Sequence, residues 1–485
     1  HRGPLSLPIR NNYGGPVPLL RGHGNVPNRG RSRPGFREPS NPLKGEHVPT
    51  GQEKEPVRRS TRRRGAMLAI GAIASLAVLA AACGGGRSSN SSSSTTAAAK
   101  ATDFGTMKSP CGKGDAKGAT AQGVTDTQIT IGYGDDAGYT AAPGLNKEIG
   151  EAMKAMIKWC NDQGGINGRT IVGNYHDSAM LNVNNVMTEA CGKDFMLVGE
   201  GWSLDSMQEQ TRIACGLPAV PTYTVSPQFA NAPLMYQPTP NPADYYDASN
   251  AFQFAQKFPN EVKKAATFFA NYAATIDSTE KAVIAYKQAG WSFLDCAQTY
   301  SIGGEANWTP FVQRLKDCGA QVVYFSGSPA PNFENVLDAA KAINYNPIWM
   351  EEANFYDTNF AKWNVNGNAD NVYVRMTYYP FEQADKVPAV AKYLEIVKAN
   401  GGSTSLLGEQ TAAAFLLWAQ AAQSCGSTLT RDCMMTTLAK VTNFDAGGLQ
   451  SATNPGANMP GNCAMVLKMS GSKYEQILPT TVGTQ

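Results

Sequence analysis

Short apolar runs alternate with helical apolar patterns through most of this chain. Residues 128–132 predict a strand, and between residues 148 and 162 apolar side chains recur at helical spacing until Gly164 and Gly165. Strands that alternate with helices are typical of parallel α/β sheets. The pattern predicts further β-rich segments at 170–175, 195–199, 217–220, 265–270, 291–300, 321–326, 347–350, 371–377, 464–469 and 474–478. It predicts further helices at 184–191, 206–215, 277–289, 309–318, 333–343, 387–400 and 409–422.

The alternation is absent before residue 111. Residues 1–56 are rich in Gly, Pro, Arg and Asn and carry no apolar periodicity. We expect a disordered segment there, or a leader translated upstream of the true start, with Val57 as a candidate start. Residues 84–110 are mostly Gly, Ser, Thr and Ala, which is typical of a flexible linker.

A pattern typical of an export signal occupies residues 57–83. Five arginines between residues 58 and 64 precede an apolar run at 67–82, which is shorter than the ~20 residues that a bilayer-spanning helix needs. Three alanines then precede Cys83. This arrangement resembles the lipobox of bacterial lipoproteins, although Leu79 lies one position further from the cysteine than is usual there. The resemblance implies lipidation of Cys83 and anchoring to the outer face of the cell membrane. An uncleaved anchor and an ordinary secretory signal are the alternatives.

Charge is divided unevenly between the leader and the rest of the chain. Residues 1–66 hold 14 of the 42 basic residues but only 4 of the 39 acidic ones. The remainder holds 28 basic and 35 acidic residues and is therefore acidic overall, so the net charge of +3 of the whole chain is due to the segment that we expect to be removed. We expect no nucleic-acid binding, because attraction to phosphates needs a basic surface.

Nine cysteines follow Cys83, and outside the cytoplasm cysteines form disulfides more often than metal sites. Each predicted pair flanks a short turn or spans one strand or helix unit. The predicted pairs are Cys425–Cys433, Cys296–Cys318 and Cys191–Cys215. Cys111, Cys160 and Cys463 leave one thiol over, and the sequence does not decide which.

Three segments resemble the leucine/branched-chain-amino-acid-type periplasmic binding proteins of ABC transporters. Residues 123–132 (GVTDTQITIG) are similar to the opening of those proteins. Residues 161–169 (NDQGGINGR) resemble the family's N-x-x-GGINGR turn, and residues 315–324 (LKDCGAQVVY) resemble its K-x-x-GAD-VV strand entry. The resemblance covers about residues 111–480, and the three segments follow the family's order.

This resemblance implies a type I binding-protein fold, in which two doubly wound α/β lobes are joined by three crossovers. We place lobe 1 at residues 111–245 and 373–455, and lobe 2 at residues 246–372 and 456–485. The family implies a small ligand held in the cleft between the lobes and delivered to an ABC permease outside the cytoplasm. We expect a monomer that needs no cofactor and closes about a hinge when ligand binds.

Two loops of lobe 1 are the first candidates for the ligand site, because ligands of doubly wound sheets lie beyond the carboxyl ends of the strands. Loop 133–139 offers Asp135 and Asp136 as partners for a ligand ammonium, with Tyr139 beside them; a solvated turn is the alternative. Loop 200–203 offers Trp202 as a cleft wall, with a core-capping indole as the alternative. The family resemblance implies that Ser203 binds a ligand carboxylate.

Two further loops complete the predicted site. Loop 222–227 resembles the family's S-x-x-T-x-P segment and offers Tyr223 and Thr224, but the large Tyr223 departs from leucine-like recognition. In lobe 2, Tyr272 and Ser328 are the candidates. No carboxylate follows Ser328 until Glu334. A ligand ammonium would then have to bind one of four other carboxylates, those of Asp135, Asp136, Glu351 and Glu352. Phe355 and Tyr356 either add to the walls of the cleft or belong to the core of lobe 2. An amide, a larger amino-acid-like compound or an aromatic acid fits this cleft as well as leucine does.

Enzymatic chemistry finds little support in the sequence. His176 is the only histidine after the predicted signal, so the chain cannot build a multi-histidine zinc site. No G-x-S-x-G elbow and no G-x-x-x-x-G-K-[ST] loop occurs. We therefore expect a binding protein. The ligand-sensing module of a receptor system is the alternative class, because the same fold serves receptors; a neighbouring permease gene would favour transport and a kinase or cyclase gene would favour sensing.

Overall fold

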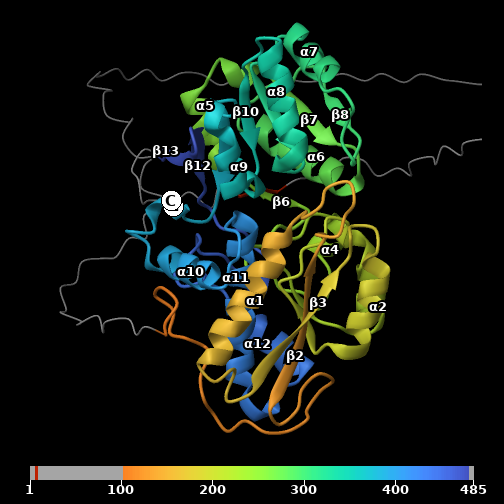
Figure 1. Cartoon of the computed structure of the whole chain (residues 1–485), viewed down its shortest axis with the longest axis vertical. Helices are drawn as coiled ribbons and strands as arrows, with labels where there is room; N and C mark the ends of the chain where they lie inside the picture. The colour runs from red at the N-terminus through yellow and green to blue at the C-terminus, as the bar shows by residue number, and fades with distance from the viewer. Residues whose placement is uncertain (1–5, 9–101, 480–485) are drawn as a thin grey trace, which may run out of the picture. The chain divides into compact units, whose positions relative to one another are not determined.

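Two β-sheets, each covered by helices, organise the folded part of the chain (Figure 1). The computed structural model describes residues 6–8 and 102–479, which belong to one unit. The predicted leader apart from residues 6–8, the signal segment with Cys83, and the linker up to residue 101 lie outside the described residues. Within the described part, no helix combines the length and the apolar character needed to cross a bilayer.

Lobe 1 is built on a four-stranded sheet in which every neighbouring pair is parallel. The spatial order is β3 (Thr170–Asp177), β2 (Gln128–Asp135), β4 (Met196–Val198) and β5 (Ala219–Val220). Its helices are α1 (Lys147–Asp162), α2 (Val183–Lys193), α3 (Glu209–Ala214), α4 (Pro227–Ala230), α10 (Pro388–Ala399), α11 (Leu406–Cys425) and α12 (Arg431–Leu438). The α11 helix is buried along most of its length and packs against α1, so the core of lobe 1 lies between them and the sheet.

Lobe 2 is built on a seven-stranded sheet. The spatial order is β13 (Lys473–Leu478), β12 (Met465–Ser470), β11 (Val372–Met376), β10 (Ile348–Glu351), β9 (Val322–Ser326), β7 (Ala265–Ala270) and β8 (Gln298–Tyr300). Its helices are α5 (Ser249–Lys257), α6 (Ala273–Gln288), α7 (Thr309–Asp317), α8 (Glu334–Ala342) and α9 (Thr358–Trp363). Phe268 and Phe325 meet edge to face with ring centroids 5.4 Å apart, at the centre of an aromatic core.

Two features of the lobe 2 sheet differ from a wholly parallel arrangement and from the predicted boundaries. Strands β12 and β13 run antiparallel to their neighbours, because β12 enters the sheet after a return from lobe 1 and β13 follows it by a tight turn at Gly471. Strand β11 pairs with β10, so the chain leaves lobe 2 after Met376 and not at residue 373.

A separate two-stranded sheet lies near the first crossover, where β6 (Tyr245–Asp247) pairs antiparallel with β1 (Ser6–Pro8).

Four disulfide bonds lie within the described residues. Three of them are the pairs Cys191–Cys215, Cys296–Cys318 and Cys425–Cys433, as the sequence predicts. The fourth is Cys111–Cys160, which decides the choice that the sequence left open. No described cysteine is free, so the prediction of a left-over thiol is wrong for this part of the chain.

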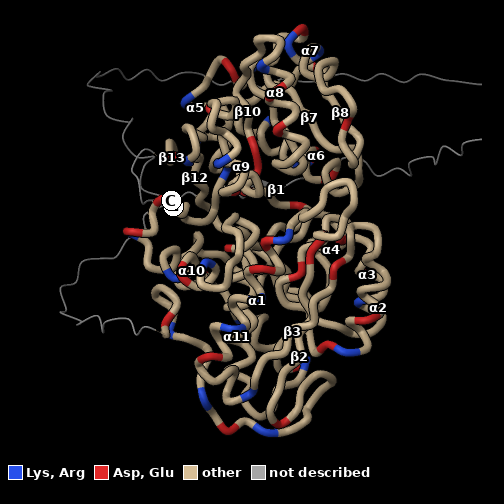
Figure 2. Tube along the Cα trace, in the orientation of Figure 1, with Lys and Arg blue, Asp and Glu red and all other residues tan. Residues whose placement is uncertain are grey.

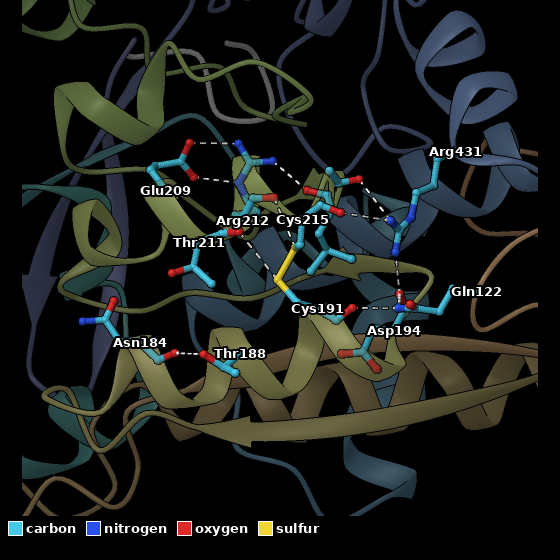
Figure 3. The surroundings of a disulfide bond; sticks show 12 residues. Gln122, Asn184, Thr188, Cys191, Asp194, Glu209, Thr211, Arg212, Cys215 and Arg431 are labelled. Atoms are coloured by element: carbon cyan, nitrogen blue, oxygen red, sulfur yellow. Dashed lines mark hydrogen bonds and ion pairs between the residues drawn. A yellow bond between two sulfur atoms is a disulfide. The ribbon is translucent and has the colours of Figure 1, made fainter.

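The Cys191–Cys215 bond ties the end of α2 to the segment that follows α3 (Figure 3). On the other side of the same loops, the Arg431 guanidinium of α12 donates to the carbonyl oxygens of Asp194, at 2.9 Å, and Gly216, at 3.2 Å. These contacts hold the far end of the lobe 1 sheet, away from the cleft-side loops described below.

The end of the predicted linker is part of the fold. Phe104 is completely buried and packs against Trp159 of α1, with ring centroids 6.0 Å apart. Ser109 Oγ donates to Gln163 Oε1 at 2.6 Å. Residues 102–110 therefore pack on lobe 1, because one aromatic side chain among small and polar residues finds a buried site there.

Candidate functional site

A cavity of about 720 Å³ lies between the two lobes and is lined by residues of both. Residues that follow β4 and β5 line it from lobe 1, and residues that follow β7, β9 and β10 line it from lobe 2. The carboxyl ends of these strands are where ligands of doubly wound sheets bind. The cavity is therefore the candidate site for a small molecule.

Six of the nine predicted site residues line this cavity. They are Tyr139, Ser203, Tyr223, Thr224, Tyr272 and Ser328. Three of the six are tyrosines, so the walls combine aromatic faces with hydroxyl groups. Their roles in ligand binding remain predictions.

The two predicted aspartates do not line the cavity. Asp135 accepts hydrogen bonds from Tyr175 and from the Gly150 and Ala137 N–H groups, at 3.1 and 3.0 Å. Burial raises the pKa of this carboxyl to about 6. Neither the solvated turn nor the ammonium site predicted for these residues occurs, because both side chains turn inward and accept hydrogen bonds from the chain itself.

Asp136 holds the loops of lobe 1 that do line the cavity. Its carboxylate accepts from the N–H of Ser203 at 2.7 Å and from the N–H of Met180 at 3.1 Å. Burial raises its pKa, against these hydrogen bonds. Asn146, in the loop before α1, donates to Ser203 Oγ and to Tyr223 OH, both at 3.2 Å. Asp136 thus positions Ser203 from beneath the cavity surface.

Trp202 is a core residue, so the predicted cleft wall is wrong. Its side chain is 1% exposed and belongs to a buried cluster that includes Leu197 and Phe229. The indole N–H donates to the carbonyl of His176 at 3.3 Å. A Cβ at Gly134 would lie 2.0 Å from the carbonyl oxygen of His176 and 3.1 Å from the indole nitrogen, so the glycine is required first by the close approach of the neighbouring strand.

Lobe 2 contributes a group of cavity residues that sequence reasoning missed. Tyr246, Tyr300 and Tyr324 line the cavity together with Lys281 and Arg375. One of these residues could have been found from the sequence: Arg375 is a charged residue in the otherwise apolar strand β11. A buried charge needs a partner, so its presence in such a strand often marks a site. Phe355 and Tyr356 are almost fully buried and belong to the core.

Arg375 and Glu352 form an ionic cluster on the lobe 2 side of the cavity. The Arg375 guanidinium lies 3.5 Å from both Asp247 and Glu352. Glu352 also accepts from the hydroxyl groups of Tyr246, at 2.6 Å, and Tyr324, at 3.0 Å. Glu352 therefore already has three partners, and Glu351 is buried away from the cavity lining.

Elsewhere in the molecule, acidic and basic positions are interspersed over both lobes (Figure 2).

A family model described as periplasmic binding protein matches residues 128–473, a span from the first residue of β2 to the first residue of β13. The chain belongs to the periplasmic binding protein family. This confirms the family and the type I fold that the three sequence segments predicted. No curated protein sequence matches this binding protein significantly.

Solved structures of similar fold bind chemically different ligands. A fatty acid ABC transporter substrate-binding protein from Thermomonospora curvata is 15% identical, with a TM-score of 0.63, and the match covers 76% of this binding protein and 95% of that chain. A branched-chain amino acid transporter protein from Streptococcus pneumoniae, in complex with isoleucine, is 14% identical with a TM-score of 0.58 and coverage of 72% and 98%. A solute binding protein from Rhodopseudomonas palustris, in complex with 3,4-dihydroxybenzoic acid, is 15% identical with a TM-score of 0.60 and coverage of 72% and 96%. At these identities the likeness concerns the fold.

Proposed function

We propose that this binding protein captures a small organic ligand between its lobes and, as a monomer without catalytic activity, delivers it to an ABC importer. The proposal depends on one observation: Tyr223 of lobe 1 and Tyr272 of lobe 2 line the same cavity. A ligand that contacts both lobes favours the closed arrangement, because part of its contacts form only on closure. A permease that binds the closed form then receives loaded protein.

The ligand that we propose is amino-acid-like, an amide or an aromatic compound. Tyrosine side chains from both lobes line the cavity, and aromatic faces bind apolar and planar groups well. Proteins of similar fold are described as binding a fatty acid, isoleucine and 3,4-dihydroxybenzoic acid. Ligands with aliphatic and with aromatic groups are thus compatible with this fold.

Alanine variants at Tyr223 and Tyr272 are expected to weaken ligand binding about tenfold each, the effect of losing ~1.4 kcal/mol of contact energy. A thermal-shift screen of the purified full chain against amino acids, amides and aromatic acids would find the ligand, since binding to the native state raises the melting temperature. Calorimetry would then give the dissociation constants of the two variants.

The control for these variants is Tyr379→Ala. Tyr379 is partly buried and does not line the cavity, so its loss removes a similar side chain without touching the ligand. Equal affinity in wild type, Tyr223→Ala and Tyr272→Ala would place the binding site elsewhere.

Membrane attachment through Cys83 is the second part of the proposal. The alanines before Cys83 and the apolar run before them support lipidation at that cysteine. We expect that Cys83→Ser shifts the protein from the membrane fraction to the soluble fraction and abolishes labelling by a clickable fatty acid. Labelling that persists in Cys83→Ser would contradict the assignment.

A further inference from the structure

Lys281 is a basic residue of the cavity wall whose hydrogen bonds are incomplete. Its ammonium group donates to Asn241 Oδ1 at 2.7 Å and to the carbonyl of Pro242 at 2.5 Å. An ammonium group has three N–H donors. The third has no acceptor among the described residues, and the side chain lines the cavity.

The other basic residues that line the cavity are paired with carboxylates. Arg375 lies 3.5 Å from Asp247 and from Glu352, and Lys147 Nζ lies 3.3 Å from Glu151. No carboxylate of the described residues lies within ion-pair distance of Lys281. Its two partners are neutral oxygens, so its charge is not balanced locally.

The charged groups around Lys281 come from four elements. Arg375 on β11 opposes its charge, whereas Glu352 after β10 and Asp244 in the crossover favour it, though from beyond ion-pair distance. Asp277 lies one turn earlier on α6 and also lines the cavity, and no ion pair within the described part of the chain joins it to Lys281. Burial is the main influence and lowers the pKa of Lys281 to about 7.

We propose that Lys281 binds a carboxylate group of the ligand, so that the natural ligand is an organic acid with an apolar or aromatic body. This inference rests on the proposed function and narrows it: amides and amines are not the transported class. A ligand carboxylate supplies both the missing acceptor and the missing negative charge, which makes the ion pair stronger than the two neutral hydrogen bonds alone.

Tyrosine side chains of the same cavity fit the body of such an acid. Tyr245 and Tyr272 line the cavity and are only partly buried, so their rings are available as walls. Ser203 and Tyr223 line it from lobe 1. One acid can therefore contact lobe 2 through its carboxylate and lobe 1 through its body.

Matched pairs of acids and amides test the inference directly, with benzoate against benzamide and octanoate against octanamide. Titration calorimetry would use the full chain as wild type, Lys281→Met, Lys281→Arg and the control Lys287→Met, a change at an exposed lysine of α6 that does not line the cavity. We expect wild type to bind an acid more tightly than its amide. Lys281→Met should weaken acid binding at least about tenfold and leave amide binding within about twofold, while Lys281→Arg keeps most of the acid affinity and Lys287→Met changes neither.

Proton exchange gives a readout that a loss of packing would not change. A bound carboxylate favours the ammonium form of Lys281, so acid binding at pH 8 should take up protons and the affinity should fall between pH 7 and pH 9. Calorimetry in two buffers of different ionisation enthalpy measures this uptake, which should be absent in Lys281→Met.

The outcomes separate this inference from the proposed function. Acid binding that Lys281→Met does not weaken, or wild-type binding of amides alone, would overturn the role of Lys281 and leave the transport function standing. Absence of binding by every acid and amide would count against both.

Discussion

Replacing Trp202 with alanine is expected to lower the free energy of unfolding by about 3–5 kcal/mol, the range found when a buried tryptophan or phenylalanine is removed from a core. The side chain is 1% exposed and packs beside Leu197 and Phe229. Its loss also leaves the carbonyl of His176 without the indole donor. Equilibrium denaturation in urea, followed by circular dichroism, measures the change.

Two further variants separate packing from other effects. Trp202→Phe keeps most of the ring burial and removes the indole N–H, so it should destabilise the protein less than Trp202→Ala. Val365→Ala truncates a side chain that is 75% exposed and should change stability very little. A Trp202→Ala protein of unchanged stability but weakened ligand binding would restore Trp202 to the cleft wall.

Asp136→Ala is expected to lower the free energy of unfolding by about 3 kcal/mol, since each buried donor left without an acceptor costs about 1–3 kcal/mol. The N–H of Ser203 and the hydroxyl of Ser178 lose their acceptor in this variant, whereas the N–H of Met180 keeps Ser178 Oγ at 3.0 Å. Ligand binding should weaken as well, because Ser203 lines the cavity and is held in place by Asp136. Urea denaturation and calorimetry on the same sample measure the two effects.

The matched control is Asp162→Ala. Asp162 pairs with Lys158 on the surface of α1, with 63% and 60% of the side chains exposed, and exposed ion pairs contribute little to stability. Asp136→Ala with the stability of Asp162→Ala would show that the buried hydrogen bonds of Asp136 are dispensable.

Local pattern was sufficient for most elements of the fold. The buried Ile129 and Ile131 alternate with Thr130, and this spacing specifies β2 without reference to the rest of the chain. Local pattern does not decide, however, which of the two sheets a strand joins. Strand β11 pairs with β10 of lobe 2, but its sequence would suit either sheet, so the boundary at residue 373 could not be found locally.

The candidate site was predicted to the level of loops and missed at the level of side chains. The rule that ligands lie at the carboxyl ends of strands selected Ser203 and Tyr223 correctly as cavity residues. The same rule cannot tell which side chain of such a loop points inward, and Trp202, the neighbour of Ser203, enters the core. Lys281 lies two turns into α6, so a rule that considers only the loops after strands does not select it.

The late arrival of β12 and β13 has a consequence for synthesis. Strand β11 is complete at residue 376, but its second edge is covered only by β12, which begins at Met465. A chain that has been made only as far as the intervening helices therefore presents an open edge of a mostly buried strand, the kind of surface that pairs with other chains. Ribosome pausing or premature termination in this interval exposes the half-made protein to aggregation, so its yield depends on how quickly about 90 residues follow β11.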